Sequence, residues 1–191
     1  MKTIYKSGYI CHPRQLYTVR RMTVAEGKAK GMDVIEICTA GGLQVDILPD
    51  TGLDIGQVRY KGTNVTFISK NGYDSTAIIN PYELEFLNTF PGGLLYTCGL
   101  RTTGGPHRDG SEWQTQHGRY HSLSAEPIAI LEEDGCIIIK GAVRETALFG
   151  YNLELKRTIR IPAMGAEITV CDELSNLGFQ PEEYALLYHC N

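Results

Sequence analysis

Three side chains able to bind or protonate a ligand alternate in the segment 116–121, which reads Gln-His-Gly-Arg-Tyr-His. If this segment is a β-strand, its period of two places His117, Arg119 and His121 on one face. An imidazole exchanges protons near neutral pH, and a guanidinium offers several hydrogen-bond donors. The pattern therefore indicates acid–base chemistry on a bound ligand. The alternative is that the histidines hydrogen-bond loop carbonyls and have a structural role.

A second histidine lies in the segment 185–191, which reads Ala-Leu-Leu-Tyr-His-Cys-Asn. On a strand, Leu187, His189 and Asn191 share one face, and Tyr188 lies on the other. A histidine among apolar neighbours is more often a hydrogen-bonded core residue than a catalytic one. Taken alone, His189 is compatible with either role.

Other common chemistries have no matching motif. The chain has no G-x-S-x-G sequence, and its Gly-Gly pairs are not followed by the Lys-Ser/Thr of a phosphate-binding loop. A zinc site built from Cys98, His107, His117 and His121 is conceivable, but the spacing matches no standard ligand pattern. We therefore expect no metal and no cofactor.

The elements that must position these residues are mostly short strands. Runs rich in β-branched residues occur in pairs around turns of Gly, Asn or Asp. The expected strands are 34–39, 43–48, 56–60, 64–68, 127–131, 136–140, 153–161, 167–172 and 183–190. One short helix is expected from Asn80, a typical N-cap followed by a proline, and should end before Pro91. This spacing predicts an all-β sandwich in a single domain over residues 1–191.

The segment 90–122 interrupts this pattern of strands. It is rich in glycine and contains three of the five histidines and the only tryptophan. A loop of this length inside a compact domain is usually either functional or disordered. Its mixture of aromatic and charged residues favours a functional loop.

Composition narrows the class of partner. The chain of 191 residues is 42% hydrophobic and 21% charged, with a formal net charge of −4 and no basic cluster, so we expect no nucleic-acid partner. We find no signal-peptide pattern and no apolar run long enough to span a bilayer, which predicts no membrane association and a cytoplasmic protein. The six cysteines include no C-x-x-C pair, and we expect reduced, mostly buried thiols.

Several blocks of the sequence resemble the galactose-mutarotase-like superfamily, most closely its bacterial aldose-1-epimerase-like branch. The first is 49–56, Pro-Asp-Thr-Gly-Leu-Asp-Ile-Gly, and the central one is 90–100, Phe-Pro-Gly-Gly-Leu-Leu-Tyr-Thr-Cys-Gly-Leu, followed by His117-Gly118-Arg119. The segment 171–176 and the final Tyr-His-Cys-Asn resemble the strand pair that ends in the family's second histidine. One departure is Thr51, which stands where this branch has arginine.

The resemblance implies a supersandwich of curved antiparallel sheets that holds a free sugar on a concave face. It also implies a cofactor-free reaction in which a carboxylate removes the anomeric proton while an acid protonates the ring oxygen. The sugar then opens, rotates and closes as the other anomer. By position, His189 matches the general acid, and His117 matches the histidine near the ring oxygen. Substrate contacts would come from four further residues: Arg119, Arg101, His121 and Asn191.

The family's base is a glutamate far downstream of the second histidine. The resemblance therefore implies a fold that is incomplete at its C-terminus, and we expect residues 1–191 alone to bind sugar weakly or not at all and not to epimerise it. The missing strands would come from a C-terminal segment or from another chain in a homo-oligomer. A non-catalytic carbohydrate-binding or sensing module is the rival interpretation, and a ligand-free structural domain is a third.

Overall fold

Alternation of apolar and polar residues builds the inner faces of two sheets. In strand β3 (Leu43–Leu48), Leu43, Val45 and Ile47 are buried, whereas Gln44 and Asp46 are half-buried. Such a strand covers a core with one face. The computed structural model describes residues 8–75 and 86–191.

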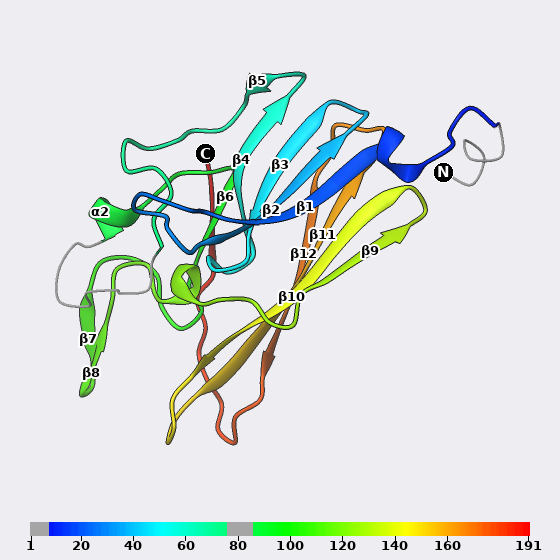
Figure 1. Ribbon diagram of the computed structural model, residues 1–191. Coiled ribbons are helices and arrows are strands. Elements are labelled where there is room, and N and C mark those ends of the chain that lie inside the picture. Colours follow the sequence, from blue (N-terminus) through cyan, green and yellow to red (C-terminus); the bar gives the residue numbers. More distant parts are fainter. Residues whose placement is uncertain (1–7, 76–85) are drawn as a thin grey trace.

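The larger sheet is antiparallel and has seven strands in the described residues (Figure 1). Its order is β1-β2-β3-β4-β6-β13, and β5 pairs with β4. Besides β3, its members are β1 (Tyr17–Thr23), β2 (Asp33–Thr39), β4 (Asp54–Tyr60), β5 (Thr63–Asn64), β6 (Leu95–Cys98) and β13 (Leu187–Cys190). Strand β13 brings the end of the chain beside β6, which is ninety residues earlier in sequence, so the sheet joins distant segments.

The second sheet packs against the first and has the order β12-β11-β10-β9. Its strands are β9 (Ala129–Glu133), β10 (Cys136–Thr146), β11 (Asn152–Pro162) and β12 (Thr169–Asn176). A separate hairpin is formed by β7 (His107–Asp109) and β8 (Glu112–Gln114). The helical elements are short: η1 (Pro13–Gln15), α2 (Phe86–Thr89) and η2 (Tyr120–Ser122).

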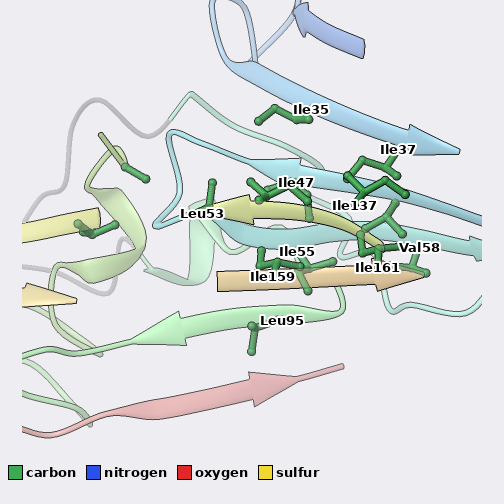
Figure 2. Packing of buried hydrophobic residues seen from close by; sticks show 14 of the residues in the cluster. Ile35, Ile37, Ile47, Leu53, Ile55, Val58, Leu95, Ile137, Ile159 and Ile161 are labelled. Atoms are coloured by element: carbon green, nitrogen blue, oxygen red, sulfur yellow. The ribbon is translucent and has the colours of Figure 1, made fainter. Parts of the chain in front are cut away.

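The core lies between the two sheets. Branched aliphatic side chains from β2, β3 and β4 meet those from β10 and β11 (Figure 2). Ile37, Ile47, Ile139, Ile159 and Ile161 are each 0% exposed. Burying such a side chain fully stabilises the fold by about 1.5–3 kcal/mol, so this layer is the main source of sandwich stability.

One cation lies inside this apolar layer. The Arg157 side chain is 0% exposed, and its guanidinium donates to both oxygens of Asp172, at 2.9 and 2.7 Å. It also donates to Asp54 and, at 2.9 Å, to the Thr97 hydroxyl. Asp54 is on β4, Thr97 on β6 and Asp172 on β12, so this arginine connects both sheets beneath strand β6. Burial raises the pKa of Asp54 to about 6, although Arg157 and Thr97 act to lower it.

The all-β prediction is confirmed, and so are most of the predicted strands. The hairpin 34–39 and 43–48 corresponds to β2 and β3, and 136–140 and 153–161 lie within β10 and β11. Two predictions were too long. In the predicted strand 64–68, only Asn64 is in a strand, and Ile68 forms an isolated β-bridge. The predicted strand 183–190 is shorter in the structure, where only β13 (Leu187–Cys190) is formed. The expected helix start at 80–83 lies outside the described residues, while α2 ends before Pro91 as predicted.

Two further expectations were wrong. The segment 90–122 is not one loop, because it contains β6, β7 and β8. All six cysteines are free, as expected, but only Cys98 is buried, and Cys11, Cys171 and Cys190 are exposed. Sparse cysteines are compatible with reduced thiols wherever they lie, so their spacing could not establish burial. No helix in the described ranges is both long and apolar enough to cross a membrane.

Candidate functional site

The outer face of the β6–β13 pair carries the first part of the candidate site. Tyr96 lies directly opposite His189 in the antiparallel register, and Thr97 lies opposite Tyr188. Thr97 contacts the buried Arg157, so the Thr97–Tyr188 pair faces the core. Because side chains alternate along a strand, Tyr96 and His189 lie together on the opposite face.

The predicted strand at 116–121 is wrong, because the chain turns sharply there. His117 and Gly118 have left-handed backbone angles, with φ values of 59° and 74°, and residues 120–122 form the short helix η2. Two backbone hydrogen bonds to Gly99 hold the turn. The Gly99 N–H donates to the His117 carbonyl at 3.0 Å, and the Arg119 N–H donates to the Gly99 carbonyl at 2.9 Å. Arg119 is exposed, so the three side chains do not form one strand face.

This turn nevertheless places His117 and His121 in one group of rings with His189. The Phe86 ring centroid lies 4.8 Å from that of His117, 6.0 Å from His121 and 5.8 Å from Tyr96. Phe90 lies 5.1 Å from Phe86 and 5.5 Å from His189. We call this group the aromatic–histidine cluster, and its members are Phe86, Phe90, Tyr96, His117, His121 and His189.

Burial keeps two of these histidines neutral. It lowers the pKa of His121 to about 4, with a further lowering from nearby His117. Burial and the proximity of His189 also lower the pKa of His117. The Nδ1 atom of His117 accepts a hydrogen bond of 3.3 Å from the Gly104 N–H. The proton of the neutral ring is therefore on Nε2, which makes that atom a hydrogen-bond donor.

Two other predicted contact residues, Arg101 and Asn191, bind partners within the protein. The Arg101 guanidinium donates to Glu182 at 2.7 Å and to Glu112 at 2.6 Å, and it stacks 3.9 Å over the Tyr151 ring. The Asn191 side chain donates to backbone carbonyls, that of Gly93 at 3.3 Å and that of His189 at 3.2 Å. The structure therefore brings His117, His121 and His189 together, whereas Arg101 and Asn191 are engaged by other partners.

Sequence reasoning missed the aromatic half of the cluster. Phe86, Phe90 and Tyr96 occur in segments with no alternation, and their proximity to the histidines depends on contacts between segments far apart in sequence. It also missed Glu145, a buried carboxylate that accepts a hydrogen bond of 3.0 Å from the Leu100 N–H. Within the described part of the chain, no three His, Cys, Asp or Glu side chains converge closely enough to hold a metal ion.

The two packed antiparallel sheets have the galactose-mutarotase-like sandwich fold. A Klebsiella pneumoniae protein assigned provisionally as an aldose 1-epimerase superposes with a TM-score of 0.81 over 91% of this chain, at 20% identity. A galactose mutarotase-like protein from Clostridium acetobutylicum superposes with a TM-score of 0.61 over 92%, at 14% identity. This chain spans 47% and 54% of those two proteins, about half of each.

The chain belongs to the family described as Domain of unknown function (DUF4432), whose model matches residues 29–191. That match includes the turn at His117 and strand β13. No curated protein matches the sequence.

Proposed function

We propose that the aromatic–histidine cluster binds a free aldose, as part of a protein that interconverts sugar anomers. The single observation that carries this proposal is the convergence of His117 and His189, which are seventy-two residues apart, on one face beside three aromatic rings. Aromatic rings and hydrogen-bonding imidazoles are suited to the apolar faces and hydroxyl groups of a sugar. The fold shared with aldose-epimerase-like and mutarotase-like proteins supports the same assignment.

In the proposed reaction, His189 is the general acid that protonates the ring oxygen. His117 donates a hydrogen bond from Nε2 to the same region of the sugar. Its neutral state suits this role, because a neutral imidazole with Nδ1 occupied by the Gly104 N–H has a fixed donor atom. Arg119, exposed next to the turn, would bind outer hydroxyl groups by charge-assisted hydrogen bonds.

The reaction also needs a carboxylate to remove the anomeric proton. Two buried acids of this chain are engaged in structural contacts, Asp54 with Arg157 and Glu145 with the Leu100 amide. We therefore propose that the base comes from outside residues 1–191. If no such base exists, the same cluster would serve as a sugar-binding or sensing site without turnover.

An apolar groove supports the proposal that additional strands complete the sandwich. A cavity of about 500 Å³ lies where β13 and β12 are the edges of their sheets, and Ile55, Leu95, Val170 and Tyr188 are among its lining residues. Unpaired strand edges and exposed apolar surface are normally covered. The greater length of the similar structures favours strands of a longer protein as the occupant. A second copy of this chain is the alternative, and sedimentation analysis of residues 1–191 distinguishes the two.

The test combines binding with anomer exchange. Saturation-transfer NMR measures the binding of aldoses to residues 1–191, and two-dimensional exchange NMR measures anomer interconversion by a protein extended beyond residue 191. We expect His189→Ala and His117→Ala to abolish exchange in the extended protein. His107→Ala is the matched control, because that histidine is exposed on the β7–β8 hairpin. Full exchange activity in the His189→Ala protein would refute the assignment.

A further inference from the structure

Two buried polar atoms in the aromatic–histidine cluster have no hydrogen-bond partner in the described part of the chain. They are the Tyr96 hydroxyl and Nδ1 of His121. Tyr96 is only 1% exposed and His121 only 4%. Buried polar atoms are hydrogen-bonded in nearly all cases, and the exceptions often mark a binding site or a bound water. These two atoms therefore call for a partner that the described residues do not supply.

The two groups belong to neighbouring rings. Their rings are stacked, with centroids 5.0 Å apart and an interplanar angle of 29°. Tyr96 is fixed by strand β6 and His121 by the short helix η2. Each side chain is thus held by a regular element of the fold, which favours a fixed geometry of the Tyr96–His121 pair over an adaptable one.

The chemistry of the pair selects a hydroxyl group. The Tyr96 hydroxyl is both donor and acceptor, and a neutral imidazole nitrogen is one or the other according to its tautomer. A ligand hydroxyl can accept from one group and donate to the other, whichever tautomer His121 adopts. A phosphate or carboxylate oxygen only accepts, and its charge would be poorly solvated among these rings. The pair therefore fits an uncharged hydroxyl.

Phe86 covers this pair from the side of helix α2. Its ring lies against Tyr96, His117 and His121. This ring therefore forms part of the surroundings of the pair. The same ring would then pack against the apolar face of a sugar held in the cluster.

We propose that Tyr96 and His121 together bind one hydroxyl group of the aldose and so determine at which ring position the protein requires a hydroxyl. This inference rests on the proposed function and adds to it a specificity element. A site that hydrogen-bonds a substrate hydroxyl discriminates strongly against the analogue that lacks it, because the buried polar atoms are then left unpaired.

The experiment compares an aldose with the full set of its monodeoxy analogues. Dissociation constants are measured by NMR titration for the wild-type chain and for Tyr96→Phe. We expect one deoxy position to weaken binding to the wild-type chain by about tenfold or more, and this difference to shrink below about threefold in Tyr96→Phe. The other deoxy positions should respond equally in both proteins. Tyr9→Phe is the control, because Tyr9 is 84% exposed.

A second measurement follows the His121 ring directly and does not depend on any variant. The imidazole ¹⁵N shifts of wild-type protein are recorded with the aldose and with each deoxy analogue. The His121 signal should move with every sugar that keeps the required hydroxyl and should not move with the one that lacks it. The His107 signal should stay unchanged throughout.

The outcomes separate this inference from the proposed function. If no aldose binds either the wild-type chain or the protein extended beyond residue 191, both are overturned. If aldoses bind but Tyr96→Phe keeps the same deoxy preference, the specificity role is overturned and the sugar site stands. A His121 signal that ignores bound aldose indicates that a resident water occupies the pair, and it also overturns the inference. If Tyr96→Phe does not fold, the His121 shifts decide the question.

Discussion

The Tyr188 hydroxyl donates a hydrogen bond of 2.8 Å to Oδ2 of Asp172 and so joins the edge strand β13 to the opposite sheet. Asp172 is itself held by the buried Arg157. Tyr188 immediately precedes His189, whose side chain lies on the other face of the same strand. The core-side contact therefore positions the strand that carries a candidate catalytic group.

Tyr188→Phe should loosen β13 without altering the cluster itself. Burial and the nearby Asp172 raise the pKa of Tyr188 to about 12, so its hydroxyl stays a donor at neutral pH. Loss of one such bond to a carboxylate should lower the free energy of unfolding by about 1–2 kcal/mol. Hydrogen exchange at the His189 and Cys190 amides should accelerate. Tyr184→Phe, at a side chain 65% exposed, is the control, and equal exchange in both variants would contradict the role of the contact.

Arg157→Met should be much more damaging. It leaves the buried carboxylates of Asp54 and Asp172 without their cation, and breaking a buried ion pair in this way costs about 3–5 kcal/mol. Urea unfolding measures the loss. Arg160→Met, three residues along the same strand and 42% exposed, should change stability by less than about 1 kcal/mol. Similar losses in the two variants would show that Arg157 does not organise the sheets.

The strands that sequence predicted correctly are those whose signals are local. The β2–β3 hairpin has alternating apolar residues and a glycine turn, and both are visible within fifteen residues. Strand β6 was missed because all four of its residues are buried, so it shows no alternation. Its two faces meet different surroundings, the core on one side and the aromatic–histidine cluster on the other. Only its neighbours in space reveal it as a strand.

The candidate site was predictable in part. In the sequence of β11, Arg157 alternates with charged residues and shares a face with Leu153 and Leu155, but its partners Asp54 and Asp172 lie in other strands and cannot be found from spacing. The sequence also indicated that His117 and His121 act together, but it placed them on one face of a strand. The structure achieves this with a left-handed turn, a geometry that a pattern of period two does not predict.

Acid should destabilise the fold partly through His121. The pKa of this buried side chain is lowered from 6.5 to about 4, so the unfolded chain takes up a proton at higher pH than the folded one. The stability that the neutral ring contributes is complete above pH 6.5 and is lost as the pH falls toward 4. This linkage amounts to about 2–3 kcal/mol between pH 7 and pH 4.5.

His121→Gln should remove most of this pH dependence, because glutamine has no proton to gain. The midpoints of urea unfolding at pH 7 and pH 4.5 measure this pH dependence for the wild-type chain and for His121→Gln. A smaller loss of stability in acid should remain in His121→Gln, since the pKa of His117 is also lowered. Equal acid losses in the wild-type chain and in His121→Gln would show that His121 is not held neutral by burial.

Gly118→Ala should disrupt the turn that brings His117 beside His121. Gly118 has a φ of +74°, and an added Cβ would lie 2.4 Å from the Gly99 carbonyl oxygen and 2.5 Å from that of Thr102. Backbone atoms cannot move aside as a flexible side chain can, so the loop must shift. We expect a loss of stability well above the roughly 1 kcal/mol that alanine costs in a left-handed conformation. The imidazole signal of His117 should change as well.

Gly110→Ala separates steric contact from backbone conformation. Gly110 also has a positive φ, of +57°, but an added Cβ meets nothing within 4 Å. Gly110→Ala should therefore lose only the stability that alanine costs in a left-handed conformation, and the imidazole signal of His117 should not change. If thermal unfolding and the His117 spectrum were the same in the two variants, close packing of Gly118 against Gly99 would not be what positions His117. If Gly118→Ala alone moved that signal and weakened aldose binding, the turn itself would be established as the element on which the histidine pair depends.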